Sequence, residues 1–539
     1  MRKHFTREHA EGYLTNFPEY TYGEIIDLIL VDWRPHPSSR KRFRRRVESI
    51  VLDLLFGVNE EEPRVDGIIE PPKKSREQAV GSTFVFTSAQ ANTHINENFW
   101  NSLLTLVKHK NAELHISRFT YNKQQWGKKS VKPGSVKDAD KEDIWFDPRI
   151  TPYISDNSVQ ITDDLVWCGE LNVIPTRVDP ITGFENYGEE ASIIIPHTKI
   201  AMRSVPTMKN NNTRFCYTTG AVTARNYIER AAGQRASIYH KYGALLVEVD
   251  ANGTWWARQI EADEEGYVYD LTNKYTPTGK VETDHRVASI THGDLHGSKI
   301  SRDVLEVMSQ VIDDLGPYHQ VFHDTVDFGP RNHHNLSDPH FRHKMWVQGT
   351  DSIEAEFRYI GDIISKYLAR RSTVHHFVTS NHDQAIEKWL RNIDGFYDPV
   401  NFHLWLRLNL YCADQRAAFK TPRPFWAVMQ KFLSDNFRWN FVHEDDSLVI
   451  KGVEHGVHGH LGPNGARGTP KNLRSLGNVN TGHTHSAGIV EGIYTAGVFA
   501  NLDLGYNKGP SSWSHSFIIT YPNGKRTICS IKDEKAWRE

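Results

Sequence analysis

Five short motifs rich in histidine and aspartate follow one another through the second half of the chain, and their order constrains the fold more than any other feature. They are Gly293–His296 (GDLH), His323–Asp324 (HD), Asn381–Asp383 (NHD), His455–His460 (HGVHGH) and Gly482–His485 (GHTH). A short apolar segment typical of a β-strand precedes each of the first four. Open α/β sheets bind their ligands at the carboxyl ends of strands. The pattern therefore predicts an α/β domain whose strand ends bring the motifs together in one site.

The side chains of these motifs are carboxylates, imidazoles and one amide, a combination suited to binding divalent metal ions. The chain has 28 histidines, and most of them lie in its second half. Two adjacent divalent ions can clamp the attacking and leaving oxygens of a phosphoryl displacement. The motifs therefore predict a metal-dependent phosphoesterase.

The same series of motifs resembles the calcineurin-like metallophosphoesterase superfamily over roughly residues 286–520. The resemblance implies a two-sheet α/β sandwich with two divalent metal ions at the strand ends. Carried over motif by motif, the implied metal ligands are Asp294, His296, Asp324, Asn381, His458, His483 and His485. Asp324 would bridge the two ions, because a carboxylate has an oxygen for each.

The third motif also carries the catalytic residues that the resemblance implies. His382, next to the ligand Asn381, would protonate the leaving oxygen or stabilise the charge of the transition state. Asp383 would orient the imidazole of His382. The chain departs from the family pattern at His323 and Ser380, where glycine is usual, and neither departure removes a ligand.

The fourth motif leaves the choice of ligand open between two histidines. We favour His458, because the family's ligand directly precedes a glycine and His458 leads through Gly459 into a glycine-rich segment. His455, which precedes Gly456, is the alternative.

The chain divides by composition into four predicted parts. Residues 1–57 form a basic helical unit, residues 58–79 a charged and proline-bearing linker, residues 80–285 a mixed α/β domain, and residues 286–539 the metallophosphoesterase domain. For residues 80–285 three roles stay open: a scaffold, a substrate platform or a contact within a homo-oligomer. A helix is expected in that region near Ala221–Ala232.

Basic residues favour DNA as the partner. The segment Arg40–Arg46 is almost entirely Lys and Arg, which suits either an electrostatic grip on nucleic-acid phosphates or a solvated helix face. Arg331, Asn464 and Arg467 flank the metal motifs and are the predicted substrate-binding residues. Arginine's planar fork of donors is suited to phosphate.

The fold alone does not fix the substrate, because the superfamily includes phosphatases, nucleotide phosphoesterases and SbcD-type nucleases. The layout of the whole chain is similar to phage-encoded members, including early proteins that degrade DNA. This resemblance implies a manganese-dependent DNase acting on host DNA, and the ligand set also suits zinc, iron or magnesium. The alternatives are a phosphomonoesterase or phosphodiesterase acting on nucleotides, RNA or a phosphoprotein, and a non-catalytic DNA-binding factor.

Composition gives the expected compartment. No stretch reaches the roughly 18 uninterrupted apolar residues of a membrane span, and the N-terminal residues lack the apolar core of a signal peptide. The four cysteines are too scattered for a disulfide framework. We expect no membrane partner and a cytoplasmic location, which for a phage-encoded protein is the host cytoplasm.

Overall fold

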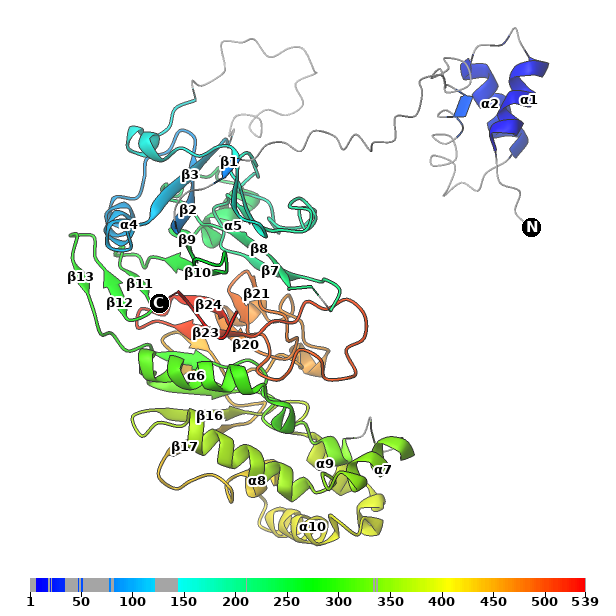
Figure 1. The fold of residues 1–539 in the computed structure, drawn as a ribbon, viewed down its shortest axis with the longest axis vertical. Coiled ribbons are helices and arrows are strands. Elements are labelled where there is room, and N and C mark those ends of the chain that lie inside the picture. Colours follow the sequence, from blue (N-terminus) through cyan, green and yellow to red (C-terminus); the bar gives the residue numbers. More distant parts are fainter. Residues whose placement is uncertain are drawn as a thin grey trace. The chain divides into compact units, whose positions relative to one another are not determined.

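The computed structural model describes residues 6–17, 20, 22–33, 47, 50–51, 77–78, 82–121, 144–209, 211–332, 335 and 338–538. The chain divides into two compact units, Met1–Ser75 and Arg76–Glu539. Figure 1 shows both units, and the second contains all five motifs.

The first unit contains helices α1 (Arg7–Asn16) and α2 (Tyr22–Trp33). Ile25 and Ile29 of α2 are buried in its apolar core. The basic segment Arg40–Arg46, for which the sequence leaves open a grip on nucleic-acid phosphates or a solvated helix face, lies outside the described residues.

The second unit contains a six-stranded sheet that leads into the first three motifs. Among the described residues its strands run in the order β17 (Arg438–Val442), β16 (Val374–Val378), β15 (His319–Phe322), β14 (Ser289–Thr291), β23 (Ser516–Thr520) and β24 (Arg526–Ser530). Strands β14 to β17 are parallel, so their carboxyl ends lie along one edge of the sheet. The strands predicted before these motifs are confirmed, and β23 and β24 pair antiparallel at the other end of the sheet.

Helices cover one face of this sheet (Figure 1). They are α6 (Arg302–Leu315), α8 (Ile353–Ile363), α9 (Ala385–Arg391), α10 (Phe402–Ala417) and α11 (Pro424–Met429), while α7 (Pro339–Val347) lies outside their shared core. α6 begins where the Ser301 side chain accepts a hydrogen bond from the Val304 amide, and it ends at Gly316. None of the helices in the described part of the chain has the length and apolar character that crossing a membrane requires.

A larger sheet joins strands from both predicted α/β regions. In the described part of the chain its order is β1 (Glu77–Gln78), β4 (Ser158–Thr162), β5 (Leu165–Cys168), β6 (Ser192–Ile195), β8 (Arg214–Thr218), β7 (Met202–Val205), β21 (Gly488–Val490), β22 (Ile493–Thr495), β20 (Val479–Thr481), β19 (Val453–Glu454) and β18 (Val449–Ile450). The two regions meet where β7 pairs antiparallel with β21. The boundary expected between residues 285 and 286 therefore falls inside one compact unit.

The remaining strands described within residues 80–285 form two smaller sheets. The first packs against α4 (Glu97–His109) and has the strand order β10 (Trp255–Glu261), β9 (Gly243–Val249), β2 (Thr83–Gln90) and β3 (Glu113–Phe119). The second has the strand order β11 (Val268–Asp270), β12 (Asn273–Tyr275) and β13 (Val281–Glu282). The helix expected near Ala221–Ala232 is wrong, because the helix here, α5, spans Ala231–Tyr239. The amide of Val222 instead bonds to the carbonyl oxygen of Ser88, so tertiary pairing overrides local propensity.

The two large sheets face one another across an apolar layer. Val321 and Val378 of the six-stranded sheet share a buried cluster with Ile450 of the larger sheet. This packing places the carboxyl ends of β14, β15 and β16 beside the loops that follow β19 and β20. All five motifs therefore meet at one edge of the paired sheets.

Candidate metal centre

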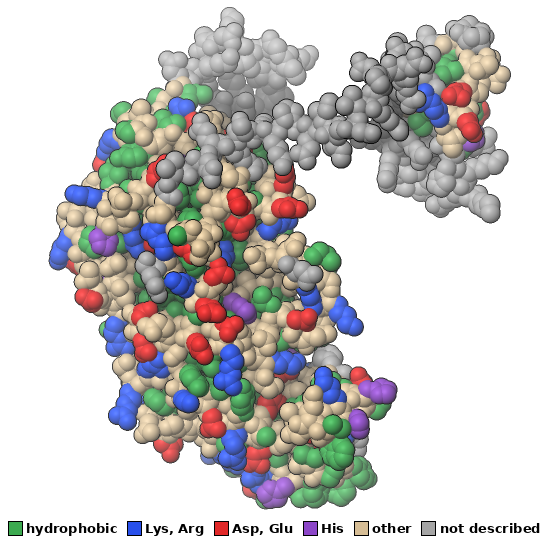
Figure 2. All heavy atoms as spheres, in the orientation of Figure 1, with side chains coloured by type: hydrophobic (Ala, Val, Ile, Leu, Met, Phe, Trp, Pro, Cys, Tyr) green, Lys and Arg blue, Asp and Glu red, His purple; other side chains and the backbone are tan. Residues whose placement is uncertain are grey.

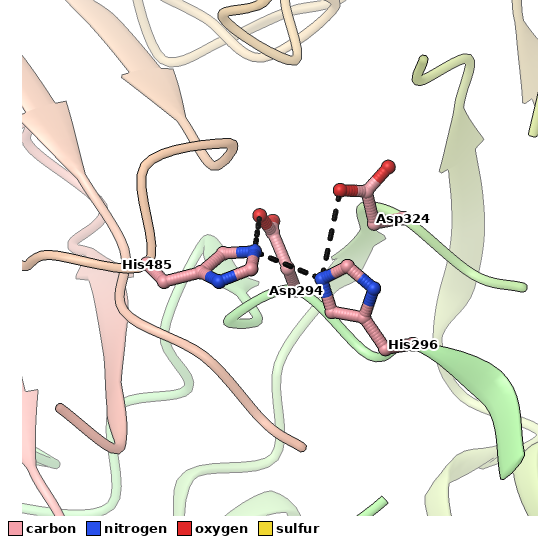
Figure 3. Close-up of side chains that lie close together, drawn as sticks. All are labelled: Asp294, His296, Asp324 and His485. Carbon is pink, nitrogen blue, oxygen red and sulfur yellow. Dashed lines mark hydrogen bonds and ion pairs between the residues drawn. The ribbon is translucent and has the colours of Figure 1, made fainter. Parts of the chain in front are cut away.

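Four side chains from the first, second and fifth motifs point toward one another (Figure 3). Nε2 of His485 lies 3.2 Å from Oδ2 of Asp294 and 2.8 Å from Nε2 of His296. Nε2 of His296 lies 3.8 Å from Oδ2 of Asp324. All four residues are buried, and their ligand atoms lie within 4.8 Å of one another. Two imidazoles and two carboxylates at these distances form a donor set for a divalent ion.

A second group of donors approaches Asp324 from the third, fourth and fifth motifs. Nε2 of His458 lies 3.4 Å from Oδ2 of Asp324 and 3.2 Å from Oδ1 of Asn381. The His483 ring is centred 5.2 Å from the His458 ring, and the His483 amide donates to Oδ2 of Asp294 at 2.7 Å. The structure thus brings all the sequence-predicted ligands together, with Asp324 between the two groups.

Four of these residues have left-handed backbone conformations that residues other than glycine rarely adopt. The φ angle is 52° at His296, 43° at Asp324, 75° at His483 and 58° at His485. Each such conformation costs about 1–3 kcal/mol and persists only where the surrounding structure holds it. Gly482 permits the close approach of two motifs, because a Cβ there would collide with a carboxylate oxygen of the first motif. Strain gathered in this way is typical of functional sites.

The cluster also contains buried acceptors that protein donors leave unsatisfied. Among the described residues, none donates a hydrogen bond to Oδ1 of Asp294 or to Oδ1 of Asp324. Although burial opposes ionisation, the facing imidazoles lower the pKa of Asp324 well below its ordinary value. A buried charged carboxylate is costly unless a cation or hydrogen-bond donor compensates it. The residues present therefore fit bound divalent cations.

His455 does not face this cluster. Its Nδ1 donates to the carbonyl oxygen of Val453 at 2.9 Å, and its Nε2 shares a hydrogen bond with Oγ of Ser289 at 3.0 Å. Because both ring nitrogens have partners inside the protein, His455 is placed as a packing residue. The geometry favours His458 as the ligand of the fourth motif.

The partner of His382 is Asp327 rather than the predicted Asp383. Nδ1 of His382 lies 3.3 Å from Oδ1 of Asp327, and that oxygen also lies 3.3 Å from Nδ1 of His296. Asp383 instead accepts a hydrogen bond at Oδ1 from the Val326 amide at 3.2 Å. The role predicted for Asp383 is corrected: its carboxylate holds the loop that carries Asp327.

Carboxylates control the charge of His382. Burial disfavours the charged ring, but Asp324 and Asp327 outweigh it and raise the pKa of His382 to about 10. These two carboxylates therefore favour the protonated ring, the form that a general acid needs before it donates. Burial and the nearby Asp324 raise the pKa of Asp383 to about 7.

A phage protein is similar to this chain over most of its length. Protein A1 of Escherichia phage T5 is 36% identical over 493 residues, which cover 88% of this chain and 86% of that protein. The chain belongs to the protein A1 family. This similarity supports a phage origin for the chain. No protein-family model matches it, and no solved structure does.

The three substrate-binding residues predicted in this protein A1 family member are placed differently. Arg331 is only 3% exposed, and its Nη2 lies 2.9 Å from Oδ2 of Asp351 and 2.8 Å from Oδ1 of Asp398. The prediction that Arg331 binds substrate is wrong, because its guanidinium already forms ion pairs with two carboxylates. Asn464 and Arg467 are exposed on the loop after the fourth motif, and their role stays a prediction.

Arg331→Met is expected to lower the free energy of unfolding by about 3–5 kcal/mol, because it leaves Asp351 and Asp398 buried without a cation. Urea denaturation followed by circular dichroism measures the change. Arg467→Met makes the same replacement at an exposed site and is expected to change stability by about 0.5 kcal/mol or less. Equal free energies of unfolding for the two variants would show that the buried ion pairs of Arg331 do not stabilise the protein.

Three ionisable residues around His382 were not predicted from the sequence. Asp327 had a signal, since it follows Asp324 by three residues and a short turn can return its carboxylate to the same site. Lys299 Nζ lies 2.9 Å from Oδ2 of Asp327, and Glu356 Oε1 accepts a hydrogen bond from the Asp327 amide at 3.0 Å. Glu356 comes from α8, and no local pattern connects it with the motifs.

Proposed function

We propose that the chain is a two-metal phosphodiester hydrolase of the calcineurin-like metallophosphoesterase superfamily, and that its substrate is DNA. The observation that carries this proposal is the pair of donor groups on either side of Asp324, the first wholly buried and the second with His458 buried. The two facing sheets, with the motifs at their strand ends, support the sandwich arrangement of that superfamily. We further propose manganese as the bound ion, and host DNA as the target of this phage protein.

In this proposal each donor group holds one divalent cation. The first group is Asp294, His296 and His485, the second is Asn381, His458 and His483, and Asp324 belongs to both. When bound, such a pair of cations supplies a nucleophile from water at neutral pH and neutralises charge on the reacting phosphate. The protein's part is to hold the donors in fixed positions, which the strained loops do before any ligand arrives.

His382 is the proposed proton donor to the leaving oxygen. Its ring packs edge-to-face on His296, with centroids 4.7 Å apart, which places it beside the first donor group. Because Asp327 faces Nδ1, Nε2 is the nitrogen available to donate the proton. Asp327 orients the ring, and Asp324 and Asp327 together favour its charged form.

The distribution of charge favours a local contact with DNA. On the face drawn in Figure 2, Lys and Arg side chains are interspersed with Asp and Glu side chains. The formal net charge of the chain is −2, so there is no excess of positive charge to attract a polyanion over the whole surface. We therefore propose that phosphates are engaged near the metal centre, where Asn464 and Arg467 lie on an exposed loop.

Purified full-length protein tests this function directly. Circular and linear duplex DNA, single-stranded DNA, RNA and mononucleotides are incubated with manganese, magnesium, zinc or iron, and metal content is measured by mass spectrometry. We expect two ions per chain and manganese-dependent cleavage of DNA. Intact DNA with every metal would refute the nuclease assignment, and turnover of mononucleotides or RNA alone would identify a different phosphoesterase.

His458→Ala and His455→Ala form a matched pair that tests the fourth-motif assignment. His458→Ala is expected to lower the metal content from two ions per chain to one, because it removes a donor that faces Asn381 and Asp324. His455→Ala is expected to keep both ions and to lose about 1–3 kcal/mol of stability from its broken buried hydrogen bonds. Metal analysis and urea denaturation separate the two effects, and the opposite result would make His455 the ligand.

A further inference from the structure

Two aromatic side chains stand beside the metal centre on the loop before β23. The Trp513 ring is centred 4.2 Å from the ring of the predicted ligand His485, in an edge-to-face arrangement. The Tyr506 ring is centred 5.9 Å from the Trp513 ring and is 54% exposed. The loop therefore presents an exposed aromatic surface next to the candidate site.

Tyr506 interacts electrostatically with the carboxylates of the candidate site. Burial of its hydroxyl raises the pKa of Tyr506, and Asp327, Asp324 and Asp294 raise it further. An exposed aromatic ring at this position is available to stack on part of a bound substrate.

A lysine lies between the aromatic surface and the proposed acid. Nζ of Lys299 is 5.8 Å from the centre of the Tyr506 ring and 2.9 Å from Oδ2 of Asp327, whose other oxygen faces His382. The Lys299 side chain is about one-third exposed, at 34%. An ammonium group in this position can contact a substrate phosphate while the ring beside it contacts a base.

Residues from the first half of the second unit form hydrogen bonds and an ion pair with the loop before β23, which carries Tyr506 and Trp513. Thr207 and Ser511 exchange two backbone hydrogen bonds, at 2.9 and 2.8 Å. Oγ1 of Thr213 donates to the carbonyl oxygen of Trp513 at 2.6 Å, and Lys209 Nζ lies 3.0 Å from a carboxylate oxygen of Asp503. Residues 80–285, whose role stays open from the sequence, therefore support the loop that carries Tyr506 and Trp513.

We propose that Tyr506, Trp513 and Lys299 form a nucleotide subsite in which Tyr506 stacks on an unpaired base while Lys299 contacts the adjoining phosphate. This inference rests on the proposed hydrolysis of DNA and names the form of DNA that the site takes. Bases inside a duplex are stacked on their neighbours and cannot lie on a protein ring without leaving the helix. The preferred substrate is therefore single-stranded DNA, or a frayed end or flap of a duplex.

An oligonucleotide with one abasic position tests this subsite. Wild-type protein with manganese is expected to cleave an intact single strand roughly tenfold faster, in kcat/KM, than the same strand lacking the base beside the cleaved bond. Tyr506→Leu is expected to cleave both strands at the same reduced rate, whereas Tyr506→Phe retains the difference. Tyr318→Leu is the matched control, since Tyr318 is 49% exposed and precedes β15 at the end opposite the site.

A binding measurement keeps this test separate from the test of hydrolysis. A single strand carrying 2-aminopurine is mixed with full-length protein in EDTA, where the fluorescence of the base falls when it stacks on an aromatic ring. Wild-type, Tyr506→Phe and Tyr318→Leu proteins are expected to quench the signal, and Tyr506→Leu is expected to lose the quenching.

The outcomes separate the two proposals. Quenching that depends on Tyr506 in a protein that cleaves no DNA would keep the subsite and refute the nuclease. Cleavage with no difference between intact and abasic strands, or quenching that is absent from wild type or unchanged in Tyr506→Leu, would overturn the subsite and leave the nuclease standing.

Discussion

Asp324→Asn is expected to reduce DNA cleavage by about a thousandfold or more, because both donor groups lose the carboxylate that they share. Asparagine has nearly the same shape but is neutral and offers a single oxygen. The imidazoles of His296 and His458 would then face no charge between them. Metal content is expected to fall from two ions per chain to one or none, and cleavage rates with manganese are measured beside metal analysis.

Asp435→Asn provides the control for this loss. Asp435 is exposed and lies outside the motifs, so the same chemical change there is expected to leave both metal content and cleavage unchanged. Circular dichroism shows whether Asp324→Asn is folded. A folded Asp324→Asn protein that cleaves DNA at the normal rate would exclude the shared carboxylate as the centre of the site, whatever its metal content.

The ligands of the candidate site could be predicted because they are local in the sequence. A short apolar segment precedes each of the first four motifs, and parallel strands such as β14, β15 and β16 end at a common edge. The strand pattern therefore predicts that the motifs meet, and the resemblance of the motif series to a known superfamily implies which side chains are the ligands. The left-handed φ angles at His296 and Asp324 could not be predicted, since Asp and His adopt this conformation more often than most residues but still only in a minority of cases.

Contacts between residues that lie far apart in the sequence could not be predicted. Arg331 beside the second motif suited a phosphate contact, but its partners Asp351 and Asp398 lie on later segments that the fold brings back. The same limit applies to the larger sheet, where β7 and β21 pair although most of the second unit separates them in sequence. Periodicity predicts that a strand exists, but not which distant strand it joins.

The exchange of roles between Asp327 and Asp383 has the same origin. Asp383 is next to His382 in sequence, and that adjacency made it the expected partner. Successive side chains point in different directions, so the carboxylate of Asp383 reaches the Val326 amide instead. Asp327 reaches His382 from another loop, because the parallel strands β15 and β16 end side by side.

His382→Ala is expected to reduce DNA cleavage by about a hundredfold to ten-thousandfold while both metal ions stay bound. In the proposed function the ring supplies a proton to the leaving oxygen. It lies outside the two donor groups and packs edge-to-face with the His296 ring. Cleavage rates and metal content are measured on the same preparations. Loss of an ion together with activity would show that His382 is a ligand and not the acid.

Asp327→Asn separates the acid role of His382 from a merely structural one. Asp327 raises the pKa of His382, so its removal lowers that pKa, and the ring loses its proton at a lower pH than in wild type. The decline of activity on the alkaline side is therefore expected to move to lower pH in Asp327→Asn, and to disappear in His382→Ala. A general loss of activity in Asp327→Asn with an unchanged pH profile would mean that Asp327 only holds the loop in place.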